Sequence, residues 1–394
     1  MIESRAAHLG ICQTYRYIAG HPERVQGTHN RWRLGRRPAL DGVRGVAILL
    51  VLARHGGLPL ESAGSVGVAL FFGLSGFLIT ELLLEEFEKD RTIRFRAFYA
   101  RRVRRLLPAL VVSIAAVALA GVFLGPRFFT WHHAVAALFY VGNWVLVSGL
   151  SLSSLTHTWS LAVEEQFYLV WPLVVWFMAR RGRRAVMLAA GLGVALALVW
   201  FVWAVATGVP WYRIYFSTEA ACLSLLTGAA TAAWMGRRSA PIVKSRLRYA
   251  GWVLIIVGAA LPEIATITVT PVTTAVAVAL VLPSAAGSSD ALLEMPILRW
   301  FGERSYSIYL WNGPSATWLR EEWHWPWWAL LLVVIPSGVA LGALSYRWVE
   351  APFRRRRGAL GASRDGSAHG PGNGGPGADT RGVQTGDAHP EPAL

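Results

Sequence analysis

The amino-acid sequence predicts an all-α protein, a polytopic membrane helix bundle with about ten transmembrane helices and one re-entrant or interfacial segment. Hydrophobic residues make up 54% of the 394 residues and charged residues only 15%, whereas soluble domains carry roughly 25% charged residues. The nineteen tryptophans point the same way, because tryptophan collects at membrane interfaces. We therefore expect a multi-pass protein of the cell membrane.

Apolar stretches recur along almost the whole chain. A helix needs about 20 apolar residues to cross the hydrocarbon core. Eleven stretches come close to this length: about 39–55, 64–84, 106–125, 134–150, 159–179, 185–206, 217–235, 249–262, 267–286, 305–319 and 327–346. They define a membrane domain over 38–357, between a leader at 1–37 and a Gly- and Pro-rich tail at 358–394, both expected to be disordered and cytoplasmic.

Basic residues indicate which stretches cross, because short cytoplasmic loops are enriched in Lys and Arg. The clusters at 31–37 and 89–105 place the start of the chain and the second connection inside. If 134–150 crossed the membrane, the cluster at 180–184 would fall outside; if it does not cross, this and the later clusters fall inside. We therefore expect ten crossings, both termini in the cytoplasm, and 134–150 as the re-entrant or interfacial segment.

Composition also excludes some classes of function. A formal charge of +15 can indicate a nucleic-acid partner, but here the basic residues cluster between apolar stretches, as topogenic charge does. No nucleic acid is therefore expected. The two cysteines, Cys12 and Cys222, are far apart in the chain and cannot form a metal cluster, so no metal site is expected either.

The first apolar stretch contains two ionisable residues, Arg44 and His55, at a spacing of eleven. Eleven residues advance an α-helix by three turns plus about 20°, so the two side chains share one face, about 16 Å apart. Ionisable groups inside a span are costly and are by default candidates for function. The alternative is an arginine paired for packing and a histidine at the membrane interface.

An arginine cluster, "FYARRVRRLLP" (98–108), precedes the third stretch. Arg102 and Arg105 are one turn apart and share a helix face. The planar guanidinium group suits phosphate. Either topogenic charge or a cytoplasmic phosphate-binding site would explain this cluster.

The segment "SLTHTWSLAVEEQFYLVWPL" (154–173) brings His157 and two adjacent carboxylates, Glu164 and Glu165, into one span. Adjacent positions on a helix point about 100° apart, so one carboxylate can face a cavity while the other bonds a neighbouring helix. A histidine near a carboxylate is an arrangement for general-base chemistry. We expect the two glutamates to lie at the same depth in the membrane as His55.

Six motifs, in order along the chain, make the sequence resemble the acyltransferase-3 family of integral-membrane O-acyltransferases. They are "ALDGVRGVAILLVLARH", "GVALFFGLSGFLIT", "FYARRVRRLLP", "HTWSLAVEEQFYLVWP", "SYSIYLW" and "YRWVEAPFRR", and they cover about residues 38–357. The resemblance implies transfer of an acyl group, acetyl or longer, from acyl-CoA as co-substrate, with no bound cofactor. The implied acceptor is a carbohydrate hydroxyl, on a cell-surface glycan or glycolipid or on a macrolide-type sugar.

The resemblance also implies site residues, because three family motifs match polar positions already described. The family's arginine–ten residues–histidine motif matches Arg44 and His55. Its paired arginines match Arg102 and Arg105, and its glutamate pair matches Glu164 and Glu165. The arginines are then the acyl-CoA ligands, and the histidine and glutamates are catalytic.

The sequence departs from the family pattern at one position. Where family members have histidine after "YLW", this chain has Asn312, which cannot titrate, so a proton-relay role is not expected there. Some members also carry a fused esterase-like extracellular domain, and the tail at 358–394 is too short and polar to be one.

These observations predict a mechanism in which the arginines bind the acyl-CoA phosphates on the cytoplasmic side. His55 then accepts the proton of the acceptor hydroxyl as it attacks the thioester, and Glu164 or Glu165 orients the histidine. A transporter of sugars or drugs is the main alternative, since it would also carry intramembrane charge, although no inverted repeat is evident. A glycosyltransferase would favour an Asp-x-Asp motif, and the sequence has none.

Overall fold

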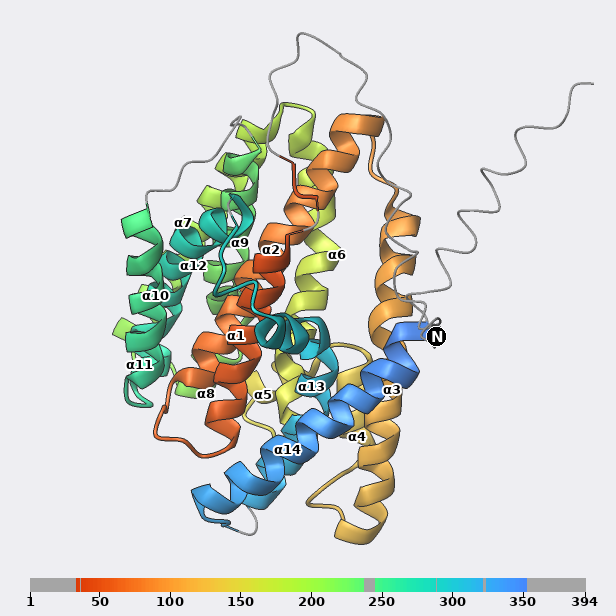
Figure 1. The fold of residues 1–394 in the computed structure, drawn as a ribbon. Helices are drawn as coiled ribbons and strands as arrows, with labels where there is room; N and C mark the ends of the chain where they lie inside the picture. Colours follow the sequence, from red (N-terminus) through yellow and green to blue (C-terminus); the bar gives the residue numbers. More distant parts are fainter. Residues whose placement is uncertain (1–32, 36, 237–244, 288, 322–323, 353–394) are drawn as a thin grey trace, which may run out of the picture.

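The structure, a computed structural model, describes residues 33–35, 37–236, 245–287, 289–321 and 324–352, and within these ranges the regular elements are all helices (Figure 1). The expected disordered segments at 1–37 and 358–394 lie almost entirely outside the described residues. The elements are α1 (Pro38–His55), α2 (Ala63–Asp90), α3 (Phe95–Leu124), α4 (Trp131–Leu138), α5 (Gly142–Val147), the 3-10 turn η1 (Ser153–Thr158), α6 (Trp159–Ala179), α7 (Arg183–Ala206), α8 (Trp211–Tyr215), α9 (Thr218–Met235), α10 (Ser245–Ala260), α11 (Ala265–Thr268), α12 (Thr270–Gly287), α13 (Pro296–Glu321), α14 (Trp327–Ser345) and the π-helical turn η2 (Tyr346–Glu350).

Six helical segments of the described chain are long and apolar enough to cross a membrane: α2, α3, η1 with α6, α7, α12, and α14 with η2. The expected count of ten crossings is therefore not confirmed. Two of the four remaining expected spans fall short for identifiable reasons. Helix α1 contains Asp41, Arg44 and Arg54 among its 18 residues, and the apolar part of α10 is shorter than a span, at Leu247–Ala260.

The segment at 134–150 folds into two short helices, α4 and α5, of eight and six residues. At 1.5 Å per residue neither approaches the about 30 Å of a hydrocarbon core. Gln166 of α6 supports the turn between them, because its amide nitrogen donates to the Tyr140 carbonyl at 2.9 Å and to Asn143 Oδ1 at 2.8 Å. Buried irregular backbone at membrane depth needs such protein partners.

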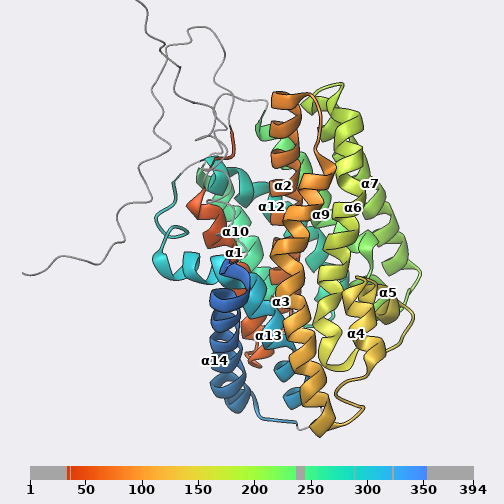
Figure 2. The same cartoon turned by 90° about the vertical axis from the view of Figure 1, so that its right-hand side faces the viewer.

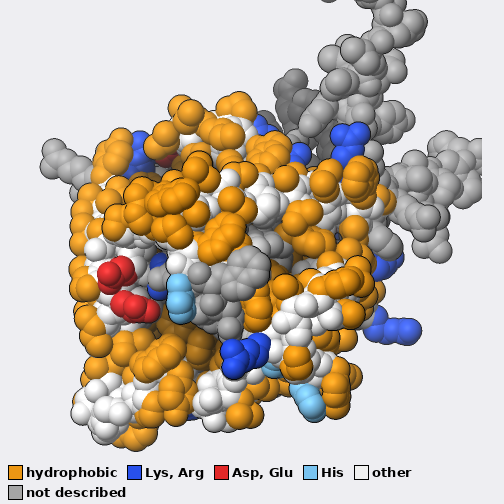
Figure 3. All heavy atoms as spheres, turned by 90° about the horizontal axis from the view of Figure 1, so that it is seen from below, with side chains coloured by type: hydrophobic (Ala, Val, Ile, Leu, Met, Phe, Trp, Pro, Cys, Tyr) orange, Lys and Arg blue, Asp and Glu red, His pale blue; other side chains and the backbone are white. Residues whose placement is uncertain are grey.

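The two ends of the helix bundle differ in the number of charged side chains. Figure 2 shows the α2–α3 and α6–α7 turns together at its upper end, and α4 and α5 near the other end. The basic segments at 89–105 and 180–184 therefore extend from the same end, as the topology without a crossing at 134–150 requires. Figure 3 views the opposite end, where hydrophobic side chains predominate and only a few charged groups interrupt them.

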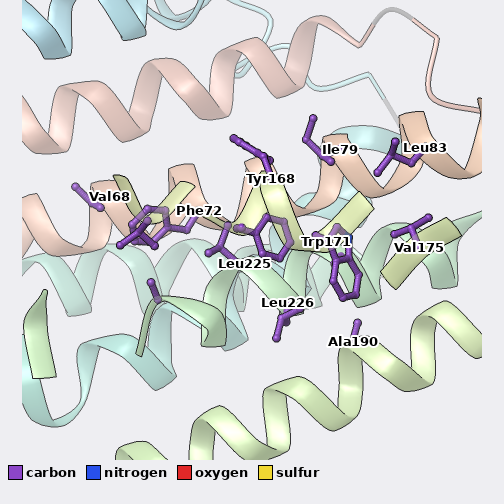
Figure 4. Close-up of a cluster of buried hydrophobic side chains, with 14 of the residues drawn as sticks. Val68, Phe72, Ile79, Leu83, Tyr168, Trp171, Val175, Ala190, Leu225 and Leu226 are labelled. Carbon is purple, nitrogen blue, oxygen red and sulfur yellow. The ribbon is translucent and has the colours of Figure 1, made fainter. Parts of the chain in front are cut away.

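The core is built around α2, which packs closely against α9. A Cβ atom placed on Gly76 would lie 1.8 Å from the Leu225 carbonyl oxygen, and one on Gly228 would lie 1.9 Å from the Gly73 oxygen. The two backbones are thus in contact without intervening side chains, the usual role of small residues between membrane helices. Around this contact lies a cluster of buried side chains from α2, α6, α7 and α9, which Figure 4 shows.

A buried ion cluster joins α7 to α2. Both terminal nitrogens of Arg183 donate to the Glu81 carboxylate, at 2.7 and 2.8 Å, and its Nε donates to Glu88 at 2.7 Å. Glu81 is fully buried. A bidentate pair of this kind fixes geometry, and it explains why Arg183, the first residue of α7, lies inside although its neighbours at 181 and 184 are exposed.

Candidate active site

A cavity of about 900 Å³ lies among α1, α2, α3, α6 and α13. Four arginines of α3 contribute to its wall, together with carboxylates and hydroxyl groups from the other helices. The polar residues that line it are Arg44, Ser75, Glu86, Arg101, Arg102, Arg104, Arg105, Tyr140, Ser160, Glu164, Glu165, Tyr168, Ser305, Tyr306 and Tyr309. The structure therefore brings five of the six predicted site residues to one cavity; the sixth, His55, is not part of its wall.

Arg102 is held in this wall by a carboxylate and an aromatic ring. Its Nη2 donates to Glu165 Oε1 at 2.9 Å, and its guanidinium carbon lies 3.3 Å from the centre of the Tyr168 ring. A cation this close to an aromatic face gains a further electrostatic contribution. Arg102 thus connects α3 to α6, and its guanidinium group is shared with protein partners.

Arg105 lies one turn further along α3 and faces a different carboxylate. Its Nε is 3.8 Å from Glu350 Oε1, and the other oxygen of Glu350 accepts a hydrogen bond from Ser307 at 3.1 Å. The Glu350 side chain is almost fully buried, whereas that of Arg105 is about half exposed, at 46%. The buried carboxylate therefore anchors one edge of a guanidinium group that still reaches the cavity.

The two adjacent glutamates of α6 point to different neighbours, as their helical spacing predicted. Glu164 faces α2, where the Ser75 hydroxyl donates to its Oε1 at 2.9 Å, and the Tyr168 hydroxyl lies 3.5 Å from its Oε2. Glu165 faces α3 and pairs with Arg102. Both line the cavity.

His55 ends α1, and its ring is hydrogen-bonded through Nδ1 to Oδ1 of Asn312 on α13. We expected Glu164 or Glu165 to orient this histidine, but the structure shows neither carboxylate hydrogen-bonded to it. Glu164 contacts Ser75 and Glu165 pairs with Arg102. The hydrogen bond to His55 comes instead from the side-chain amide of Asn312, 257 positions away in sequence.

Tyr309 connects the cavity to the region of the histidines. Tyr309 lines the cavity. Its hydroxyl donates to the His157 carbonyl at 2.7 Å and lies 2.7 Å from the Ser160 hydroxyl. The His157 ring packs edge-on against Tyr309, with ring centres 5.6 Å apart. Asn312 follows Tyr309 by three positions, so the His55–Asn312 pair lies about one turn further along α13 than the last residue of this helix that lines the cavity.

Sequence reasoning missed Tyr309, Ser160 and the contact of Asn312. Tyr309 lies in the motif "SYSIYLW" (305–311) and Asn312 directly follows the motif, three positions after Tyr309 and on the same face of α13, so the signal was present. No group of three or more His, Cys, Asp or Glu side chains within the described ranges is arranged to hold a metal ion.

Comparisons with known proteins agree with the motifs. A family model described as an acyltransferase domain matches residues 37–347. Peptidoglycan O-acetyltransferase OatA of Listeria monocytogenes is 34% identical over 350 residues, which cover 81% of this chain and 56% of that protein. The Bacillus subtilis protein YrhL, named provisionally as a peptidoglycan O-acetyltransferase, is 33% identical over 350 residues, covering 80% of this chain and 55% of its own length.

A Staphylococcus aureus protein named provisionally as an O-acetyltransferase is 29% identical over 350 residues, with 81% of this chain and 57% of that protein covered. The chain thus spans little more than half the length of these curated relatives. No solved structure matches it significantly.

Proposed function

The chain belongs to the acyltransferase-3 family of integral-membrane O-acyltransferases, and we propose that it transfers an acetyl group from acetyl-CoA to a hydroxyl group of a carbohydrate. The observation that carries the proposal is the cavity, whose wall includes four arginines of α3 together with Ser160 and Tyr309. Its volume of about 900 Å³ lies within the range typical of small-molecule sites.

In this proposal the arginine wall binds the phosphates of CoA. Arg101, Arg104 and Arg105 offer planar donors suited to phosphate oxygens. Arg102, held by Glu165 and Tyr168, contributes charge and fixes the position of α3 against α6. Arg44 of α1, whose Nη1 pairs with Asp41 Oδ1 at 3.2 Å, adds a further guanidinium group to the same cavity.

The acyl transfer itself is assigned to His55 as general base. The acceptor hydroxyl oxygen attacks the thioester carbonyl carbon while His55 takes the hydroxyl proton. The carbon–sulfur bond then breaks, and the departing CoA thiolate takes a proton back from the imidazolium. Such catalysis contributes about 10²–10⁴-fold.

The acceptor class we favour is a cell-wall glycan. Two relatives are named for O-acetylation of peptidoglycan, and this name supports a polymeric sugar acceptor over the sugar of a small secreted molecule. Muropeptides and peptidoglycan strands are therefore the first acceptors to assay.

Donor binding is the decisive experiment, because it needs no acceptor. Thermal unfolding of the detergent-purified full chain is followed at increasing acetyl-CoA concentration, since a ligand that binds only the folded protein raises its apparent stability. We expect a saturable rise in Tm for wild type. Arg105→Ala should need about tenfold more acetyl-CoA, whereas Arg96→Ala, on the same helix but not in the cavity wall, should behave as wild type.

The absence of any Tm rise in well-folded wild type, with acetyl-CoA or longer acyl-CoA, would reject the donor site. A flux assay in vesicles would then test the transporter alternative. Equal losses in Arg105→Ala and Arg96→Ala would show that general positive charge, and not this cavity, binds the donor.

A further inference from the structure

Asn312 is a fully buried amide held between two helices and His55. It lies on α13, its Oδ1 contacts His55 Nδ1 at the end of α1, and its Nδ2 donates to the Val334 carbonyl of α14 at 3.3 Å. Each polar atom of the side chain thus has a partner from a different helix.

The orientation of this amide is determined by its second partner. A backbone carbonyl such as that of Val334 can only accept, so the NH2 group of Asn312 must face it. A flipped amide would direct an acceptor oxygen at another acceptor. The side chain also has little room to turn, because a Cβ on Gly338 of α14 would lie 2.8 Å from Nδ2 and 2.9 Å from Cβ of Asn312.

The fixed amide in turn determines the protonation pattern of His55. With Oδ1 as an obligate acceptor, His55 Nδ1 must carry a hydrogen to make the bond. This holds for both the neutral and the charged ring, so Nε2 is the nitrogen that gains and loses a proton. A second hydrogen bond of this kind is what distinguishes the two ring nitrogens of functional histidines.

We propose that Asn312 is a positioning residue for acyl transfer: it holds His55 in the Nδ1–H tautomer, so that the Nε2 lone pair is the base that takes the acceptor proton. This inference rests on the proposed function for its catalytic meaning. It assigns to Asn312 a role that needs no titration, which an amide side chain can fill.

The tautomer is measured directly, without turnover. The full chain is produced with 15N-labelled histidine, and long-range 1H–15N spectra report which ring nitrogen carries the hydrogen. The His55 signals are identified by their loss in His55→Gln. We expect the Nδ1–H form in wild type and a substantial population of the Nε2–H form in Asn312→Leu, which has similar volume and no acceptor.

Kinetics supply the second readout. Asn312→Leu should lower kcat by at least about tenfold, the size of effect seen when a group that orients a functional histidine is removed. Its acetyl-CoA midpoint in thermal unfolding should stay within about threefold of wild type, because Asn312 is not in the cavity wall. Asn312→Asp keeps an acceptor toward His55 but loses the donor to the Val334 carbonyl, so its readout is the tautomer, and we expect the Nδ1–H form.

Ser315→Ala is the control for packing on α13. Its hydroxyl donates to the Asn312 backbone carbonyl at 3.2 Å and does not contact His55, so tautomer and kcat should match wild type. An Nε2–H tautomer in wild type, an unchanged tautomer in Asn312→Leu, or loss of the Nδ1–H tautomer in Asn312→Asp would overturn the inference. If wild type transfers no acyl group at all, the proposed function fails while the tautomer measurement still decides the role of Asn312.

Discussion

Arg102 and Glu165 form an ion pair of 2.9 Å between α3 and α6, with the Arg102 guanidinium also stacked on Tyr168 at 3.3 Å. Both charged side chains are mostly shielded, with exposed fractions of 18% and 22%. Sequence alone assigned these two residues to different tasks, donor binding and catalysis. The structure makes them one unit that sets the distance between two walls of the cavity.

Breaking this pair should destabilise the protein. Arg102→Ala and Glu165→Gln each leave a mostly buried partner without its counter-charge, and we expect each to lower the free energy of unfolding by about 1–3 kcal/mol. The double variant should lose less than the sum, because the second change removes an already unpaired group. Thermal unfolding in detergent measures all three. Arg94→Ala removes an arginine that is 65% exposed where it pairs with Glu86, and it should give a clearly smaller loss. Strict additivity at Arg102 and Glu165 would contradict the coupling.

The role of His55 as general base predicts a loss in kcat that leaves donor binding unchanged. His55→Ala should lower kcat about 10²–10⁴-fold, measured as acetyl transfer to muropeptides, while its acetyl-CoA midpoint in thermal unfolding stays at the wild-type value. His132→Ala, an exposed histidine of α4, is the matched control. Retention of more than about a tenth of wild-type kcat in His55→Ala would remove the base assignment.

The close approach of α2 and α9 predicts a large difference between two glycine variants. Gly76→Ala would place a methyl group 1.8 Å from the Leu225 carbonyl oxygen, so the helices must separate, and we expect a loss near the upper end of about 1–3 kcal/mol. Gly191→Ala on α7 meets nothing within 4 Å and should be neutral or stabilising by up to about 1 kcal/mol. Comparable Tm values for the two variants would show that α2 and α9 are not in backbone contact.

Cysteine accessibility tests the predicted orientation in the membrane. In a background without Cys12 and Cys222, a cysteine at position 181 should resist a membrane-impermeant thiol reagent in intact cells, and one at position 151 should react. Position 181 is preferable to its neighbour Gly182, whose φ of 92° is unfavourable for any side chain with a Cβ. Labelling at 181 together with protection at 151 would reverse the assigned orientation.

Hydropathy located the helices better than it located their ends. The apolar stretch at 217–235 corresponds to α9 (Thr218–Met235), whereas the stretch at 106–125 gave only the later part of α3 (Phe95–Leu124). Hydropathy detects apolar side chains, and a helical backbone continues through polar ones. The first turns of α3 contain the arginine cluster, so the helix begins well before the stretch that hydropathy identifies.

The candidate site was predictable only where one helix carries the whole pattern. Arg44 and His55 lie on one helix at a spacing that can be read from the sequence. The partners of Glu164 and His55 could not be derived in this way, because Ser75 and Asn312 come from other helices. Which neighbour a side chain meets depends on how the helices pack, and no periodicity in a single sequence encodes that.

The helices that form the cavity wall are packed unequally, so displacing one of them would disrupt more contacts than displacing another. Helix α2 is in backbone contact with α9 through Gly76 and is tied to α7 by Arg183, so displacing it would disrupt the centre of the protein. Helix α3 buries only six of its 30 residues, and it contributes four arginines to the cavity. Widening the cavity would therefore displace α3 and not α2, and it would first have to break the Arg102–Glu165 pair that holds α3 to α6.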